Sequence, residues 1–161
     1  MYNKRVIVAL DSENFNKIKK LIIDLKEEAY GFKLGYEFFF NYGIVGYKKI
    51  RKICPNIFLD LKLHDIPNTV QKGIKAIDKL KPILTTIHIS GGDDMMKASL
   101  LNRKFTKILG VSILTSLNNK QTKKYYNEKN LDVLVKKMVK EAKKNNLDGI
   151  VCSPKEIKFI R

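Results

Sequence analysis

Residues 60–69 read Asp-Leu-Lys-Leu-His-Asp-Ile-Pro-Asn-Thr and follow a short apolar, β-prone run at residues 56–59. In an extended chain Asp60 and Lys62 lie on one face, while the leucines beside them point to the other face. A charge inside a fold is costly unless it is paired. Because acid, base and acid occur close together, we interpret Asp60, Lys62 and Asp65 as a self-neutralising functional group rather than a surface ion pair.

The chain after these charges has the pattern of a helix start. Ile66 and Pro67 lead into a polar pair, and we expect Asn68 or Thr69 to be the N-cap residue. Strand, charged loop and helix in this order form one βα unit.

The same unit recurs along the chain. Short apolar runs predict strands at residues 5–10, 31–34, 57–63, 83–89, 108–114 and 149–152. Apolar residues at three-to-four spacing predict helices at residues 14–28, 38–53, 70–80, 93–101 and 131–145. The polar patch at residues 118–130 predicts a loop or a short helix. This alternation indicates a parallel sheet covered by helices.

Residues able to do chemistry gather where the predicted strands end: Asp11, Lys33, Asp60, Lys62, His88, Thr115 and Ser153. Enzymes with (β/α) barrels carry their active sites at this edge. A doubly wound open sheet follows the same rule, but the first βα turn, residues 10–14, contains no glycine and thus no dinucleotide fingerprint. We therefore predict an α/β fold of the (β/α)8 TIM-barrel type. About six βα units are present, in a single incomplete domain over residues 1–161.

The high positive charge does not by itself indicate nucleic-acid binding. The chain carries a formal charge of +16, but only four of its 32 basic residues are arginine. Arginine is the better reader of bases. The lysines are scattered among apolar residues of the predicted helices, so we interpret them as solvated outer faces. We expect no nucleic-acid partner.

The cysteines and the N-terminal segment favour a cytoplasmic protein. Cys54 and Cys152 lie in unrelated segments without Cys-x-x-Cys spacing, so neither a disulfide framework nor a zinc site is expected. The apolar run at residues 6–10 is too short for a signal sequence. No stretch is long enough to span a bilayer, and we expect no membrane association.

Five segments of the chain resemble orotidine 5′-phosphate decarboxylases. They are Val-Ala-Leu-Asp at residues 8–11, Phe-Lys-Leu-Gly at 32–35, the decapeptide at 60–69, His-Ile-Ser-Gly-Gly at 88–92 and Val-Ser-Ile-Leu-Thr-Ser at 111–116. They occur in family order over essentially the whole chain. The resemblance implies decarboxylation of orotidine 5′-monophosphate to UMP, the last step of de novo pyrimidine synthesis. It implies neither a metal ion nor an organic cofactor.

The resemblance also assigns catalytic roles. Lys62 is implied as the donor of a proton to C6 of the pyrimidine, and Asp60 is implied to lie near the substrate carboxylate. Lys33 and Asp65 complete a charged tetrad. Loss of CO₂ from C6 leaves a poorly delocalised carbanion, so a fixed ammonium group at that carbon stabilises the developing charge.

Further positions are implied to bind substrate. Asp11, together with Lys33, is expected to hold the ribose hydroxyls, and Thr115 is placed among the substrate contacts. In the family, Asp65 and Thr69 reach the active site of the neighbouring subunit. A homodimer is therefore implied.

The sequence ends earlier than the resemblance predicts. A full eight-unit barrel has roughly 250 residues, and this sequence stops after the sixth predicted strand. Strands seven and eight, with the Gln and Arg that bind the substrate phosphate in the family, lie outside it. We therefore expect a C-terminally truncated barrel, and the activity of the 161-residue form is an open question at this point.

Two other readings remain. Related magnesium-dependent sugar-phosphate decarboxylases and synthases share the Asp-x-Lys-x-x-Asp pattern, although the Ile-Pro-Asn-Thr continuation at residues 66–69 argues against them. A non-enzyme, either an inactive remnant or a basic nucleic-acid binder, is the third reading. Nucleic-acid binding predicts a steep dependence of affinity on salt.

Overall fold

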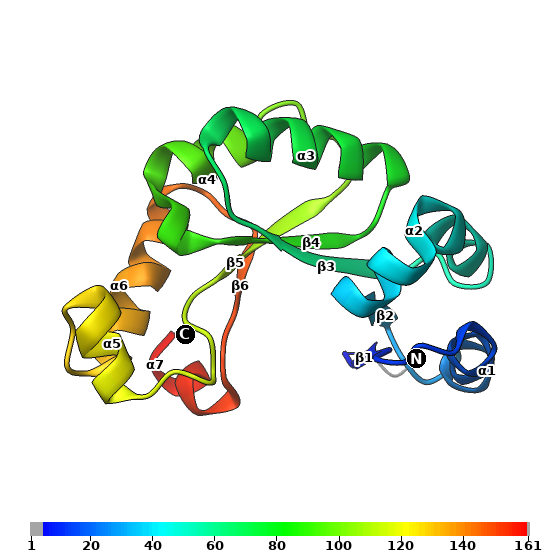
Figure 1. Ribbon diagram of the computed structural model, residues 1–161, viewed down its shortest axis with the longest axis horizontal. Coiled ribbons are helices and arrows are strands. Elements are labelled where there is room, and N and C mark those ends of the chain that lie inside the picture. The colour runs from blue at the N-terminus through cyan, green and yellow to red at the C-terminus, as the bar shows by residue number, and fades with distance from the viewer. Residues whose placement is uncertain (1–4, 161) are drawn as a thin grey trace. The chain divides into compact units, whose positions relative to one another are not determined.

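The structure, a computed structural model, describes residues 5–160 and contains one sheet with the strand order β1-β2-β3-β4-β5-β6 (Figure 1). The strands are β1 (Ile7–Ala9), β2 (Gly31–Leu34), β3 (Ile57–Leu63), β4 (Leu84–His88), β5 (Lys107–Val111) and β6 (Gly149–Val151). The pairs β1–β2, β2–β3 and β5–β6 are parallel. Sequential parallel strands joined by helices confirm the predicted α/β fold of the TIM-barrel type.

Each strand is followed by a helix. The helices are α1 (Phe15–Leu25), α2 (Tyr36–Arg51), α3 (Pro67–Leu80), α4 (Gly92–Leu100), α5 (Asn119–Tyr126), α6 (Leu131–Lys144) and α7 (Ile157–Ile160), with short 3₁₀ turns η1 (Ile89–Gly91) and η2 (Pro154–Glu156). The polar patch at residues 118–130 contains the short helix α5, whose N-cap Asn118 forms a capping box with Gln121.

The predicted start of α3 was wrong. The helix begins at Pro67, so Asn68 and Thr69 lie inside its first turn rather than at the N-cap. The backbone N–H groups of Thr69 and Val70 both donate to the carbonyl oxygen of Ile66, at 3.0 and 3.1 Å. Proline suits a first helical position because its missing N–H would have no partner there and its φ is already helical.

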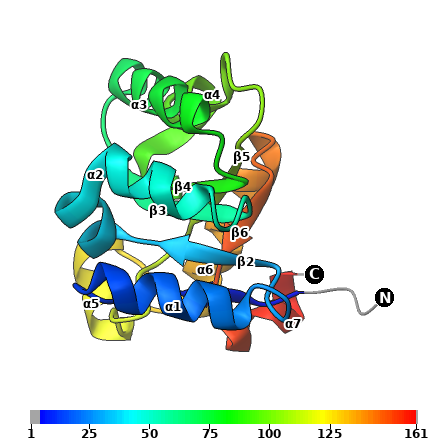
Figure 2. The ribbon, with the colours of Figure 1, turned by 90° about the vertical axis from the view of Figure 1, so that its right-hand side faces the viewer.

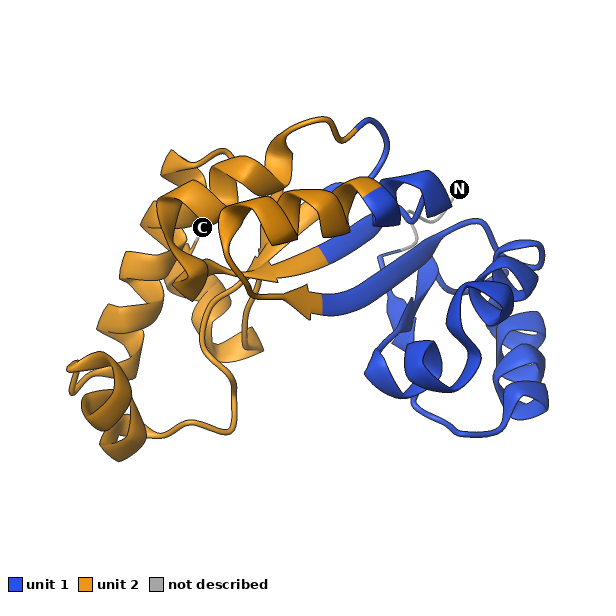
Figure 3. Ribbon diagram, turned by 45° about the horizontal axis from the view of Figure 1, so that its top comes forward, with its two compact units in different colours: residues 1–61, 76–85, 104–107 blue, residues 62–75, 86–103, 108–161 orange. Residues whose placement is uncertain are grey.

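The chain divides into two compact units (Figure 3). Unit 1 comprises residues 1–61, 76–85 and 104–107, and unit 2 comprises residues 62–75, 86–103 and 108–161. The first boundary falls within β3, between Leu61 and Lys62. The expectation of a single domain stays a prediction.

Unit 1 builds its core from β2, β3 and the helices next to them. In α1, Ile18 and Ile22 lie one turn apart and are fully buried, as their spacing predicts. Figure 2 shows α1 alongside the β1–β2 pair. From the sheet, Phe32 and Leu59 are also fully buried. This packing fixes the ends of β2 and β3, where the candidate charges lie.

A buried carboxylate joins two segments of unit 1. Asp78, near the end of α3, is 7% exposed and accepts hydrogen bonds from the backbone N–H groups of Lys104, Phe105 and Thr106, at 2.9, 3.0 and 2.9 Å. Burial raises the pKa of Asp78, but these hydrogen bonds outweigh burial and hold its pKa below the usual range. Asp78 therefore holds the chain entering β5 against the end of α3.

Unit 2 has its own apolar core. Buried side chains from α3, β4, α4, β5 and α6 pack together; they include Val70, Ile74, Ile87, Met95, Ile108 and Val135. The N-cap of α6 is Asn130, whose side chain accepts hydrogen bonds from the backbone N–H groups of Asp132 and Val133. This core anchors the segment that begins at Lys62.

Candidate active site

The first part of the site is built by strand register in unit 1. Ala9 pairs with Lys33, and the backbone N–H of Leu10 donates to the carbonyl oxygen of Lys33 at 3.0 Å. Asp11 follows Leu10 directly, so it leaves β1 at the edge where Lys33 lies. Asp11 is exposed, as a ligand-binding carboxylate can be.

Lys33 and Asp60, two members of the charged tetrad that the resemblance implies, form an ion pair. The Lys33 Nζ lies 3.4 Å from the Asp60 Oδ2. The side chain of Asp60 is 8% exposed and that of Lys33 is 26% exposed. A buried carboxylate needs such a partner, because removing one charge from water is costly unless the other compensates. The pair therefore keeps an anionic oxygen inside the fold, at the middle of β3.

Lys62 has an unusual backbone for a strand residue. Its φ is 41°, in the left-handed region, although it lies within β3. A non-glycine residue in this region costs about 1 kcal/mol, and such residues persist where the surroundings dictate them, often at active sites. The Lys62 backbone N–H donates to the Thr86 Oγ1 at 2.9 Å, which anchors the residue to β4 within unit 2.

Asp65 and Thr69 lie at the start of α3 and are both exposed. The Asp65 Oδ1 accepts a hydrogen bond from the backbone N–H of Ile66 at 2.7 Å. A carboxylate at a helix N-terminus is favoured by the helix dipole. Both side chains are therefore available to a partner molecule or to substrate.

Two histidines of unit 2 lie together beside this segment. The rings of His64 and His88 are 5.1 Å apart between centroids. A Cβ placed on Gly91 would lie 3.2 Å from the His64 Cδ2, so the imidazole packs against the η1 turn. This contact fits a histidine that packs the turn.

Thr115 lies farther from its strand than predicted. β5 ends at Val111 rather than at Leu114, and Thr115 lies in an exposed turn closed by a hydrogen bond from the Leu117 N–H to the Leu114 carbonyl oxygen at 2.9 Å. Its assignment as a substrate contact stays a prediction.

Sequence analysis missed three side chains that support β3. Thr85, fully buried, donates to the Leu59 carbonyl oxygen at 2.8 Å, and Tyr36 donates through its hydroxyl to the Leu61 carbonyl oxygen at 3.0 Å. Thr86 is the acceptor for Lys62. Two adjacent threonines inside the predicted apolar strand were the available signal, because a buried hydroxyl requires a partner.

The residues that the structure describes contain no cluster of three His, Cys, Asp or Glu side chains that could hold a metal ion. Within residues 5–160, no helix is both long enough and apolar enough to cross a membrane.

Residues 4–161 match the family described as orotidine 5′-phosphate decarboxylase / HUMPS. The orotidine 5′-phosphate decarboxylase of Buchnera aphidicola (subspecies Baizongia pistaciae) is 39% identical over 163 residues, which cover 99% of this chain and 69% of that protein. The one from the Wolbachia of Brugia malayi is 40% identical over 153 residues, covering 94% of this chain and 68% of that protein.

Solved structures are similar over the same length. The crystal structure of orotidine 5′-phosphate decarboxylase from Lactobacillus acidophilus has a TM-score of 0.87 at 36% identity and covers 98% of this chain and 75% of that one. The enzyme from Methanocaldococcus jannaschii, complexed with the inhibitor BMP, has a TM-score of 0.78 at 26% identity, with coverage of 98% and 72%.

Proposed function

Because this chain belongs to the orotidine 5′-phosphate decarboxylase / HUMPS family, we propose that it decarboxylates orotidine 5′-monophosphate to UMP in pyrimidine biosynthesis. The observation that carries the proposal is the ion pair between Lys33 and the buried Asp60, within β2 and β3. It lies directly before Lys62, whose backbone is held in a strained conformation. Charges kept at a strand end at such cost favour catalysis over a structural role.

The proposed reaction breaks the bond between C6 and the carboxylate carbon, and the electron pair stays on C6 as CO₂ departs. Lys62 faces this carbanion with its ammonium group and transfers a proton to C6. A fixed cation at the carbon that becomes negative lowers the barrier without needing to reorganise. The general-acid step then forms the C6–H bond of UMP.

The other site residues position charges and substrate. Asp60 lies near the departing carboxylate, and Lys33 and Asp65 complete the charged group around Lys62. We assign the ribose hydroxyls to Asp11 and Lys33, and a further substrate contact to Thr115. The structure holds Lys33 in place through Asp60, which supports its part in this arrangement.

We further propose a cytoplasmic enzyme. Cys54 and Cys152 are both free, as thiols stay in a reducing compartment.

Turnover of orotidine 5′-monophosphate tests the proposed function. We would measure UMP formation by the 161-residue chain, and by this chain joined to the segment of the Lactobacillus acidophilus enzyme that lies beyond the matched region. We expect Lys62-dependent turnover in at least one form, unchanged by a metal chelator. No turnover in either form would refute the proposal. Turnover abolished by the chelator and restored by magnesium would instead assign the chain to the metal-dependent members of the scaffold.

We also propose that the enzyme is a homodimer in which Asp65 and Thr69 act in the partner's site. Both residues are exposed at the start of α3, as residues that reach another subunit must be. If Asp65 acts in trans, mixing inactive Lys62→Ala and Asp65→Ala chains creates mixed dimers with one intact site. Random pairing should then restore roughly a quarter of full activity.

Mixing Lys62→Ala with Lys33→Ala chains is the matched control. Both of those residues act within their own subunit in this proposal, so no mixed dimer would contain an intact site. Equal recovery in the two mixtures, or none in either, would contradict the role of Asp65 in trans.

A further inference from the structure

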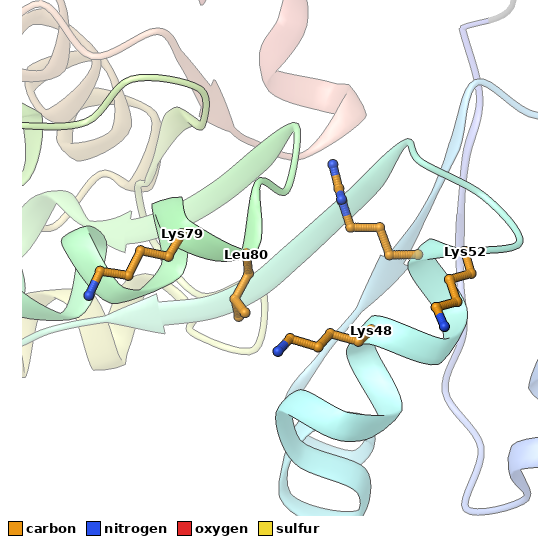
Figure 4. Close-up of a pocket in the computed structure, with 5 residues that line it drawn as sticks. Lys48, Lys52, Lys79 and Leu80 are labelled. Atoms are coloured by element: carbon orange, nitrogen blue, oxygen red, sulfur yellow. The ribbon is translucent and has the colours of Figure 1, made fainter.

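A basic pocket lies within unit 1. It has a volume of about 290 Å³ and is lined by Lys48, Arg51, Lys52, Lys79 and Leu80 (Figure 4). The helices α2 and α3 end here, before the chain enters β3 and β4. None of the proposed catalytic or substrate-binding residues lines this pocket, so a ligand in it would not occupy the proposed catalytic site.

The lining of the pocket is positively charged without compensation. Four of its five side chains are cations and none is an acid. No salt bridge joins Lys48, Arg51, Lys52 or Lys79 to another residue of the described range 5–160. Gathering like charges raises the free energy of the fold, and an anion bound among them lowers it.

Arg51 gives the second, independent observation. Its Nε is buried and has no hydrogen-bond partner within the described part of the chain. Buried N–H donors are nearly always paired, because an unpaired one forfeits the hydrogen bond that it made with water. The guanidinium group of Arg51 therefore has unused hydrogen-bonding capacity, and it belongs to a residue that lines the pocket.

A hydrogen bond links the two helices that line the pocket. The hydroxyl of Tyr47, a fully buried side chain, donates to the Leu80 carbonyl oxygen at 3.3 Å. Burial raises the pKa of Tyr47 to about 12, although the charge of Arg51 acts in the opposite direction. The tyrosine therefore stays a hydroxyl donor near neutral pH. This link holds the end of α2 against the end of α3, and Figure 4 shows Lys48 extending from α2 toward Leu80.

Cations at helix C-termini are favourable in themselves because they oppose the helix dipole. That effect explains single lysines at the ends of α2 and α3. It does not explain a buried guanidinium nitrogen without a partner, nor the meeting of cations from two helices around one cavity.

We propose that this pocket binds the polyphosphate group of a small anion, with the guanidinium group of Arg51 donating hydrogen bonds and with Lys48 and Lys79 contributing charge from the two helices. Phosphate oxygens match the planar donors of a guanidinium group. A nucleic-acid strand fits less well, because no aromatic side chain lines the pocket for base stacking.

Calorimetric titration of the 161-residue chain with pyrophosphate, at constant ionic strength, tests the proposal. We expect saturable binding with one site per chain. The double variant Lys48→Ala/Lys79→Ala should weaken it at least about tenfold, since two charge-assisted contacts are lost. Arg51→Lys keeps the charge but removes the planar guanidinium donors and should also weaken binding, by several-fold.

The matched control is Lys49→Ala/Lys75→Ala. It removes one exposed lysine from each of the same two helices, and neither residue lines the pocket. We expect an affinity within about twofold of the unchanged chain, because the net charge contributes little at fixed salt. Equal weakening in both double variants would mean diffuse attraction to a cationic protein. That result, or an absence of saturable binding, would overturn the proposal.

A parallel titration with ATP identifies the source of the polyphosphate. Equal affinity for ATP and pyrophosphate would indicate that the pocket recognises the phosphates alone. Tighter binding of ATP would indicate that it also contacts the nucleoside. Tighter, Lys48- and Lys79-dependent binding of a single-stranded oligonucleotide would overturn the proposal. Turnover of orotidine 5′-monophosphate should not change in the Lys48→Ala/Lys79→Ala variant, so this test is independent of the proposed catalytic function.

Discussion

Lys62→Ala is expected to lower the turnover of orotidine 5′-monophosphate by at least about 10⁴-fold, because it removes two contributions together. A fixed charge aimed at the reacting atom and a positioned general acid each contribute about 10²-fold or more. The measurement is the first-order rate of UMP formation at saturating substrate, in whichever form of the chain turns over.

The fold should survive the loss of the Lys62 side chain. Two further variants serve as controls, one for stability and one for turnover. Lys62→Gly also removes the ammonium group but accepts the φ of 41° without steric cost. Its free energy of unfolding should stay within about 1 kcal/mol of that of the unchanged chain, with turnover still lost. Lys72→Ala, at an exposed position of α3 in the same unit, should keep full turnover. A Lys62→Ala or Lys62→Gly chain that is folded and nearly fully active would refute the assigned role.

Asp78→Ala is expected to lower the free energy of unfolding by about 3 kcal/mol, the second large effect. The substitution leaves three backbone N–H groups, those of Lys104, Phe105 and Thr106, without their acceptor. Each hydrogen bond to a charged acceptor contributes on the order of 1 kcal/mol or more, and the N–H of Thr106 would in addition stay buried without a partner. Asp78→Asn should cost less, since the amide oxygen can still accept. Denaturation in urea, monitored by circular dichroism, measures both.

The pH dependence of stability gives an independent check on Asp78. Its pKa is lower in the folded chain than its ordinary value. The carboxylate therefore contributes its full stabilisation above a pH of about 4, and loses it as the pH falls through the folded pKa. The difference in unfolding free energy between the unchanged chain and Asp78→Asn should shrink below that pH. Asp24→Asn, at an exposed position of α1, should have little effect at any pH. A pH-independent difference at Asp78 would contradict the role of its charge.

The sequence by itself determined the fold class and the order of the elements. β2 and β3 begin and end at the predicted residues, because the apolar residues on either side of Lys33, Asp60 and Lys62 are those that a largely buried strand requires. The spacing of Ile18 and Ile22 likewise predicted the buried face of α1. The sequence placed Lys33 and Asp60 on two predicted strands, but their pairing was found only in the tertiary structure, where β2 and β3 are neighbours in the parallel sheet.

Two element boundaries predicted from local sequence, the start of α3 and the end of β5, differ from the structure. Asn68 and Thr69 both favour N-cap positions, but α3 begins at Pro67, which suits a first helical position. The hydrogen bonds from the Thr69 and Val70 N–H groups to the Ile66 carbonyl oxygen form the first turn of the helix. β5 ends at Val111 rather than at Leu114, since Ile113 stays in the core of unit 2 without continuing the strand and Leu114 is exposed.

Other features arose only from tertiary structure. The left-handed backbone of Lys62, its anchor on Thr86 and the buried Nε of Arg51 depend on segments distant in the sequence, and no periodicity encodes them. The same holds for Asp78. In the sequence it is one of several charges on an amphipathic helix, and its hydrogen bonds to the segment before β5 are formed only in the folded chain. Sequence patterns record which face of an element is apolar. The partner that a buried polar group finds is decided only when the elements pack, because that partner must be supplied by another part of the fold.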